Sequence, residues 1–255
     1  MSPSVRYLPT LLLLVDIGVN AASLEVVADE WCPINCRPED AAPGYAIEIL
    51  NAVFAQDEID YRVLPWKRAV HNVKKGTSAA AIGAGSDITE REGLQVGQEP
   101  IGLIYDCLYV ASGNPARYRG NADDLNSIKR LGIALGYVYE DGFKEWIERP
   151  DNAPKLFITS GDQPSMRNLR KLVDGSLDGM IEAGVVMDYQ LLRTGLAQQV
   201  ISAGCDTPQP IYMAFGPKGT KGDVLIEAFD KGMADLRHSG RLGEILRKYG
   251  VRDWK

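Results

Sequence analysis

The sequence predicts an α/β protein of two lobes, each with a mostly parallel β-sheet flanked by helices, joined by two crossings of the chain. Two observations lead to this fold class. Short apolar runs alternate with stretches whose apolar residues recur at helical spacing, and this pattern produces parallel strands covered by helices. The long apolar segment 101–112 interrupts the alternation, which then starts afresh. We therefore expect crossings near residues 107–112 and 205–213, which would confine relative motion of the lobes to a hinge.

The first half of the chain alternates strands with helices. The helix 66–75 carries a narrow apolar stripe between Ala69 and Val73, and Gly76 follows it as a C-terminal cap. The run 79–83 is small and apolar, which suits a strand buried on both faces. The expected elements, in order, are strand 24–28, helix 44–56, strand 60–64, helix 66–75, strand 79–83 and a further helix from Thr89.

The second half repeats the alternation and then returns to the first lobe. The expected elements are strand 130–135, helix 140–148, strand 155–158, helix 164–173, strand 177–182, helix 185–194, strand 200–202, strand 211–215, helix 224–238 and helix 242–249. The first lobe is therefore expected to be discontinuous, with residues 22–108 and 209–255. The second lobe would comprise residues 109–208.

The first 21 residues are set apart from this fold. Arg6 gives a weakly basic start, the run 8–19 is apolar, and small residues end at Ala21 and Ala22. This pattern is typical of a secretory signal peptide that is cleaved after one of these alanines. The apolar run is too short to span a membrane. We therefore predict an exported protein.

Charge and cysteines narrow the class further. The 255-residue chain has a net charge of −6 and no basic cluster, which argues against nucleic acid as a partner. All four cysteines follow the leader, and export favours disulfides. Three pairings are possible; we favour Cys32 with Cys36, close enough to staple one loop, and Cys107 with Cys205 as the second pair. A structural zinc site is the alternative, but the wide spacings and only two histidines do not match one. No metal or cofactor is expected.

Arg91 is the first candidate binding residue. Thr89 and Glu92 form a capping-box signature, which would place Arg91 in the first turn of a helix. A cation is disfavoured there because the helix N-terminus already carries partial positive charge. An anion brought to this point would meet free N–H groups and a guanidinium together, so a carboxylate site is the functional interpretation. The alternative is a surface ion pair with a neighbouring acid, namely Asp87, Glu90 or Glu92.

These features together resemble periplasmic solute-binding proteins of the polar amino-acid ABC-transporter type (extracellular solute-binding family three, the type II periplasmic-binding-protein fold). The resemblance covers essentially the whole chain after the leader, in segments 28–31 with Pro33, 43–45, 65–69, 88–91, 135–137, 174–179 and 239–250. It implies a periplasmic monomer that is not an enzyme. Such a protein would capture a small carboxylate-bearing ligand, an amino acid or related organic acid, between its lobes. It would then serve ABC-type import or signalling, with a permease or membrane receptor as partner.

The resemblance also implies roles for individual residues. Arg91 would grip the ligand carboxylate through a bidentate pair. Ser86, with Gly85 before it in the loop, would bind the amino or carboxylate end of the ligand. Trp31 and Trp66 would form aromatic walls, which suit a small zwitterion because an aromatic face attracts a cation. The alternative is that both tryptophans belong to the core.

Two positions depart from the pattern of the family. Tyr137 stands where a small hydroxyl residue usually binds the carboxylate, so its phenol would reshape the site. Ala183 stands where an acidic residue usually binds the α-amino group, and Glu182 is one position away, on the other face of a strand. Either a bulge shifts Glu182 into place, or the ligand is not an ordinary α-amino acid.

The runner-up function is a periplasmic enzyme on the same fold, similar to cyclohexadienyl or arogenate dehydratases. It would need a well-placed acid in the cleft, for which Glu182 and Asp87 are the candidates. The sequence has no Gly-x-Ser-x-Gly elbow, no His-Glu-x-x-His helix and no P-loop. A binding protein is therefore the leading interpretation.

Overall fold

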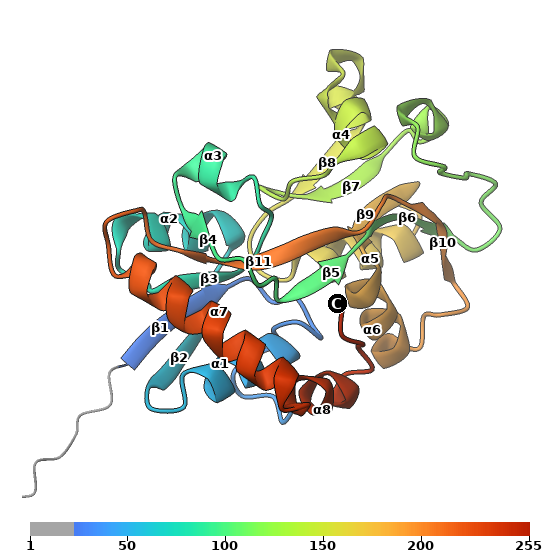
Figure 1. The fold of residues 1–255 in the computed structure, drawn as a ribbon. Helices are drawn as coiled ribbons and strands as arrows, with labels where there is room; N and C mark the ends of the chain where they lie inside the picture. Colours follow the sequence, from blue (N-terminus) through green and yellow to red (C-terminus); the bar gives the residue numbers. More distant parts are fainter. Residues whose placement is uncertain (1–22) are drawn as a thin grey trace, which may run out of the picture.

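The structure is a computed structural model that describes residues 23–255 and arranges them as two lobes, each built on its own β-sheet (Figure 1). The predicted signal peptide, residues 1–21, lies outside the described residues. Within residues 23–255, no helix has the length and apolar character needed to cross a membrane.

The first lobe contains a six-stranded sheet in the order β2-β1-β3-β11-β4, with β5 paired to β11. Its strands are β1 (Ser23–Ala28), β2 (Glu58–Val63), β3 (Ala80–Ala84), β4 (Gln95–Val96), β5 (Gly102–Ile104) and β11 (Gln209–Phe215). Its helices are α1 (Tyr45–Val53), α2 (Trp66–Lys75), α3 (Ile88–Glu92), α7 (Gly222–His238) and α8 (Arg241–Lys248). The C-terminal helices thus complete the lobe that the N-terminal segment begins.

The second lobe contains a five-stranded sheet in the order β10-β6-β9-β7-β8. Its strands are β6 (Asp106–Ala111), β7 (Leu131–Ala134), β8 (Leu156–Thr159), β9 (Gly179–Ala183) and β10 (Val200–Cys205). Its helices are α4 (Asp141–Glu148), α5 (Pro164–Val173) and α6 (Gly184–Thr194), with the short 3₁₀ helices η1 (Ala122–Leu125) and η2 (Pro150–Lys155).

Both sheets are mixed, so the prediction of mostly parallel sheets is wrong in this detail. The strand pairs that are linked by a helical crossover, β1 with β2 and β7 with β8, are parallel. The strands next to the crossings run the other way: β11 is antiparallel to β3, and β6 is antiparallel to both β9 and β10. The reason is that these strands enter a sheet from the other lobe, and not through a helix packed on the same sheet.

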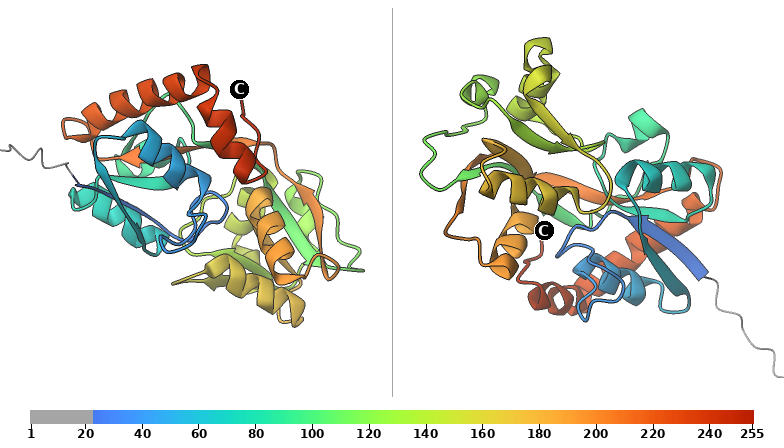
Figure 2. Two further views of the ribbon diagram at one scale, coloured as in Figure 1. Left: turned by 90° about the horizontal axis from the view of Figure 1, so that it is seen from below. Right: turned by 180° about the vertical axis from the view of Figure 1, so that it is seen from behind.

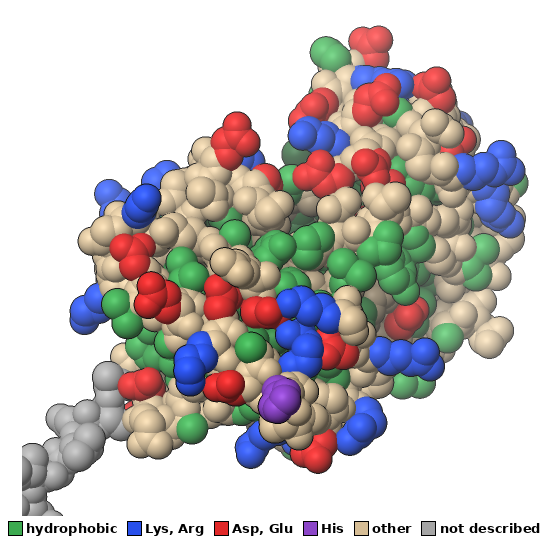
Figure 3. Space-filling view, viewed as in Figure 1, with side chains coloured by type: hydrophobic (Ala, Val, Ile, Leu, Met, Phe, Trp, Pro, Cys, Tyr) green, Lys and Arg blue, Asp and Glu red, His purple; other side chains and the backbone are tan. Residues whose placement is uncertain are grey.

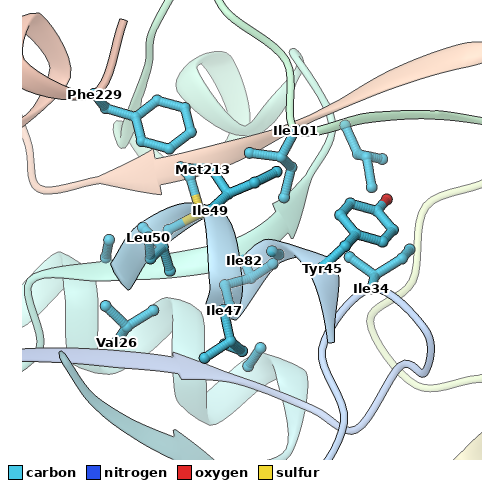
Figure 4. Packing of buried hydrophobic residues seen from close by; sticks show 14 of the residues in the cluster. Val26, Ile34, Tyr45, Ile47, Ile49, Leu50, Ile82, Ile101, Met213 and Phe229 are labelled. Atoms are coloured by element: carbon cyan, nitrogen blue, oxygen red, sulfur yellow. The ribbon is translucent and has the colours of Figure 1, made fainter. Parts of the chain in front are cut away.

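Apolar clusters cover both faces of each sheet, as expected for strands that are covered by helices on two sides. In the first lobe, one cluster joins the sheet to α1, α7 and α8, and a second joins it to α2 and α3. Figure 4 shows the first of these, with Leu50 of α1 and Phe229 of α7 directed toward Met213 of β11. In the second lobe the clusters lie under α4 and under α5 with α6. The views in Figure 2 show the helices around each sheet.

The chain passes between the sheets at 104–106 and again at 205–209. Because β6 pairs within the second sheet from Asp106 onward, we propose to draw the first lobe boundary there and not at residue 108. Cys107 and Cys205 are directly opposite on β6 and β10 and form a disulfide, and Cys32 forms the other disulfide with Cys36. Both favoured cysteine pairings are confirmed.

Candidate functional site

A cavity of about 130 Å³ lies between the lobes, beside the two crossings. Figure 3 shows the molecular surface hollowed between the lobes. The first lobe contributes the cavity residues Asp29, Trp31, Trp66, Ile82, Gly83, Gly85, Ser86, Asp87 and Arg91. The crossings contribute Ile104, Asp106, Gln209, Pro210 and Ile211, and the second lobe contributes Tyr137, Val138, Tyr139 and Glu140. Six of the seven residues that the sequence singled out for ligand binding are in this set, and Glu182 is not.

Arg91 lies on the cavity wall, but the local structure that places it there differs from the prediction. The helix α3 starts at Ile88 and has only five residues, and no capping box forms. The expected anion site at a helix N-terminus is therefore absent. Arg91 instead forms an ion pair with Asp87, with its Nε 2.5 Å from Asp87 Oδ2, as considered in the alternative. Its two terminal nitrogens have no hydrogen-bond partner among residues 23–255, so the guanidinium can still donate toward the cavity.

The loop before α3 brings Gly85 and Ser86 to the cavity beside this ion pair. Ser86 is exposed, and its hydroxyl makes no hydrogen bond within the described part of the chain. A side chain at Gly85 would collide with Asp87, because a Cβ there would lie 2.7 Å from Asp87 Oδ1. The glycine therefore allows Asp87 to fold over the loop and reach Arg91.

The two tryptophans occupy different environments in the cavity wall. Trp31 is 8% exposed and belongs to the core cluster of the first lobe, whereas Trp66 is only partly buried at the start of α2. Gly83 adopts φ +94°, and a Cβ there would lie 3.3 Å from the Trp31 ring, so glycine lets the indole lie against β3. Trp31 thus combines both interpretations, as a core aromatic and as part of the cavity wall.

Tyr137 crosses the space between the lobes. Its hydroxyl donates to Asp29 Oδ2 at 2.5 Å, and its ring packs edge-on against Trp31 with 6.2 Å between ring centroids. Burial raises the pKa of Asp29 to about 6, although the hydrogen bond from Tyr137 opposes that shift. Asp29 was missed in the sequence analysis, which noted its segment but gave the residue no role.

Glu182 does not reach the cavity. It is 3% exposed, and its Oε1 accepts from Trp31 Nε1 and from the Ala183 backbone N–H, both at 2.9 Å. Burial raises the pKa of this carboxyl above its usual range. The pairing of β9 with β6 continues to Ala183 without a bulge, so the bulge that would have shifted Glu182 is not present. Glu182 therefore links the lobes through Trp31.

The three consecutive residues 29–31, which we call the contact segment, each form one hydrogen bond to the second lobe. Asp29 accepts from Tyr137, Glu30 Oε2 accepts from Gln163 Nε2 at 2.9 Å, and Trp31 donates to Glu182. These bonds exist only when the lobes are together. They therefore stabilise closure independently of any contact made by a ligand.

The sequence analysis also missed Asp106 and Glu140, which line the cavity from the first crossing and from the start of α4. Neither carboxylate forms a hydrogen bond or an ion pair with another residue in the range 23–255. Burial raises the pKa of Asp106 to about 8, and the nearby carboxylates of Glu182, Asp206 and Glu140 add to the shift. The available signal was Asp106 itself, a lone charge inside the apolar segment 101–112.

The cavity therefore carries more negative than positive groups. Its lining includes four carboxylate residues, Asp29, Asp87, Asp106 and Glu140, and one cation, Arg91. Acidic side chains are also visible on the second-lobe side of the hollow in Figure 3. A ligand that brings at least one positive group would offset this excess, whereas a dianion would add to it.

No metal site is evident in the described part of the chain. Cys32, Cys36 and Asp40 lie close enough together to hold an ion, but the two sulfurs are bonded to each other. Of the two acids named for the enzyme alternative, Glu182 lies outside the cavity and Asp87 is paired with Arg91.

Comparison with protein-family models and with curated proteins gives no match. Among solved structures, a histidine kinase sensor domain with similarity to periplasmic binding proteins has a TM-score of 0.75 at 17% identity, covering 91% of this chain and 99% of that one. An ancestral arginine-binding protein bound to arginine has a TM-score of 0.75 at 16% identity, covering 89% and 98%. The arginine-, lysine-, histidine-binding protein ArtJ from Geobacillus stearothermophilus has a TM-score of 0.74 at 16% identity, covering 92% and 97%. The type II periplasmic-binding-protein fold is confirmed.

Proposed function

We propose that this protein is a periplasmic solute-binding protein that captures a small ligand carrying a carboxylate and at least one amine between its two lobes. The observation that carries the proposal is the lining of the interlobe cavity, which combines Arg91, whose terminal nitrogens have no partner among residues 23–255, with a surplus of carboxylates. A guanidinium fork matches a carboxylate, and the surplus acids match an ammonium or guanidinium group. An amino acid fits this combination better than a dicarboxylic acid does.

The mode of binding follows from the fold. A ligand that contacts both lobes favours the closed arrangement by the difference in its affinity for the closed and open states. The contact segment already stabilises closure, so less of the binding free energy of the ligand is needed to bring the lobes together. Ser86, Gly85 and Trp66 line the first-lobe side of this cavity, and Tyr137 its second-lobe side.

The role after capture is import through an ABC permease or delivery of a signal to a membrane receptor. Both kinds of protein occur among the structural neighbours: one is an ABC uptake transporter substrate-binding protein from Streptococcus pneumoniae with bound histidine, and another is the sensor domain of a histidine kinase. A hinged monomer that changes shape on binding suits either role. An enzyme on this fold is not favoured, because its candidate acids, Glu182 and Asp87, are engaged in other contacts.

The proposal is tested by calorimetry and thermal unfolding of the purified protein with a panel of compounds. The panel comprises basic, neutral and acidic amino acids, succinate and prephenate. At least one amino acid should bind with a dissociation constant in the micromolar range, about −8 kcal/mol, and should raise the unfolding temperature. Absence of heat and of any thermal shift across the panel would rule out this ligand class, and turnover of prephenate would favour the enzyme.

A further inference from the structure

We propose that Asp106 binds a cationic group of the ligand at the hinge end of the cavity and so determines which ligands are accepted. This inference rests on the proposed function. Asp106 belongs to none of the sequence motifs named above. Three observations support its role: the position of its carboxylate, the absence of a hydrogen-bond partner among residues 23–255, and its acidic surroundings.

The position of Asp106 is fixed by the sheet. It is the first residue of β6, and its Cα is paired directly with that of Ala183 on β9. Its carbonyl oxygen accepts the backbone N–H of Asp206 at 2.8 Å. Residues directly opposite in an antiparallel pair point to the same face, about 5 Å apart at Cβ. Asp106 therefore extends from the same face of the sheet as Ala183, which offers no polar group. Glu182 is paired with Cys107 and so extends from the other face.

The other acids near the cavity already have partners. Asp29 accepts from Tyr137, Asp87 binds Arg91, and Glu182 lies outside the cavity lining. Asp106 and Glu140 remain without a hydrogen-bond partner among residues 23–255. Of these two, Asp106 lies on a strand paired in the sheet, whereas Glu140 lies in the extended stretch before α4. Asp106 is thus the carboxylate held in place and still able to accept hydrogen bonds.

The surroundings of Asp106 provide no protein cation to neutralise it. The charged groups that act on it are Glu182 on β9, Asp206 after β10 and Glu140 before α4, all acidic. Asp29, Asp87 and Arg91 are the other charged residues of the cavity lining: Asp29 accepts from Tyr137, and Asp87 and Arg91 form an ion pair with each other. A desolvated carboxylate among acids is stabilised in its charged form by an ammonium or guanidinium brought by a ligand. Binding of such a group should release the proton that Asp106 otherwise retains below pH 8.

The test uses L-arginine and agmatine, which share the guanidinium, while agmatine lacks the carboxylate. Titration calorimetry at pH 6.5 and 7.5 compares the wild type with Asp106→Asn, which keeps the size of the side chain but cannot ionise. We expect the variant to bind both compounds at least about thirty-fold more weakly, as for loss of one partner of a buried charge pair. In the wild type, affinity should rise with pH over this range and protons should be released on binding. In the variant, most of this pH dependence should disappear.

The matched control is Asp206→Asn, which removes a neighbouring carboxylate that does not line the cavity. It should change affinity by less than about threefold, and the free Asp106→Asn protein should unfold no earlier than the wild type, because the carboxyl that is replaced has no hydrogen-bond partner among residues 23–255. Equal losses in both variants, or unchanged affinity in Asp106→Asn, would overturn this inference while leaving the proposed function in place. If the wild type bound only neutral or acidic amino acids, the role of Asp106 would likewise be overturned and the proposed function would stand. No binding of any amino acid would overturn the proposed function itself.

Discussion

The contact segment and a second group of polar residues, which line the cavity, both lie between the lobes, but they differ in how their side chains are partnered. Asp29, Glu30 and Trp31 each form a hydrogen bond to the second lobe. We call Ser86, Arg91, Asp106 and Glu140 the open wall. These four residues keep donors or acceptors that have no partner within residues 23–255.

The difference separates two roles that a hinged binding protein must combine. Partnered groups between the lobes stabilise closure but cannot also bind a ligand without losing their partner. Groups without a partner in the protein remain free to bind a ligand. Substitutions in the contact segment should therefore change stability and closure, whereas substitutions in the open wall should change affinity.

The largest expected effect is the pH dependence of stability caused by Asp29. Its pKa is about 6 in the folded protein and lies near 3.8 in an unfolded chain. The folded state therefore holds a proton between these values that the unfolded state releases, so the free energy of unfolding falls as pH rises from about 4 to about 6. A shift of about two units corresponds to about 3 kcal/mol.

Asp29→Asn, which cannot ionise, should remove this contribution, so its stability relative to the wild type should rise by up to about 3 kcal/mol between pH 4 and pH 7. Chemical denaturation at a series of pH values measures it. The control is Asp60→Asn on β2, where the hydrogen bond from Arg62 lowers the pKa of the carboxyl, so the variant should lose relative stability as pH rises. Parallel curves for wild type and Asp29→Asn would show that Asp29 ionises normally.

The second effect concerns Arg91 and belongs to the open wall. Arg91→Ala removes the two unpartnered terminal nitrogens of a residue that lines the cavity, so binding of amino acids should weaken about thirty-fold, or about 2 kcal/mol. The stability of the free protein should hardly change, because the Arg91 side chain is 40% exposed and exposed ion pairs contribute little. Calorimetry and thermal unfolding measure the two quantities.

Arg149→Ala provides the matched comparison for Arg91. Arg149 follows α4 directly and lies outside the cavity lining; its side chain is 35% exposed and forms ion pairs with Glu145, four residues earlier, and with Asp123. The Arg149→Ala variant should bind amino acids with the affinity of the wild type. If Arg91→Ala instead lowers the unfolding temperature markedly and spares binding, Arg91 is a structural residue and the open wall loses its main cation.

Trp31→Phe should have the third largest effect, on stability. It removes the N–H that Glu182 accepts and leaves a buried carboxylate with the Ala183 N–H alone, which costs about 1–2 kcal/mol. Trp66→Phe is the control, because the Trp66 indole has no hydrogen bond within the described part of the chain. Small-angle scattering should also show a larger radius for Trp31→Phe as the lobes separate. Equal behaviour of both variants would mean that the contact segment does not hold the lobes together.

The fold could largely be predicted from the sequence, but the hydrogen-bond partners of the cavity residues could not. The helix 66–75 was placed at its observed bounds because its apolar stripe and terminal glycine are local signals. The Cys32–Cys36 disulfide followed from its short spacing, Cys107–Cys205 as the remaining pair, and the two-lobed fold from the order of the elements. The mixed sheets did not, because the direction of a strand depends on the path by which the chain reaches it.

The site was predicted less completely than the fold, for a similar reason. Six of its residues could be named from short motifs, but the hydrogen bonds of Asp29 and Trp31 join residues more than 100 positions apart. No local pattern encodes such a pair. Asp106 could have been found, since a lone carboxylate in an apolar strand is costly to bury without a role.

The smallest expected effect is that of Ser86→Ala, and it tests the open wall most cleanly. The Ser86 hydroxyl is exposed and has no hydrogen bond within the described residues, so its loss should leave the stability of the free protein unchanged. Affinity for amino acids should fall about fivefold, or about 1 kcal/mol, the usual contribution of one neutral hydrogen bond. Ser127→Ala, an exposed serine outside the cavity lining, should change neither quantity. Identical titrations for both variants would remove Ser86 from the binding residues and confine the open wall to its charged groups.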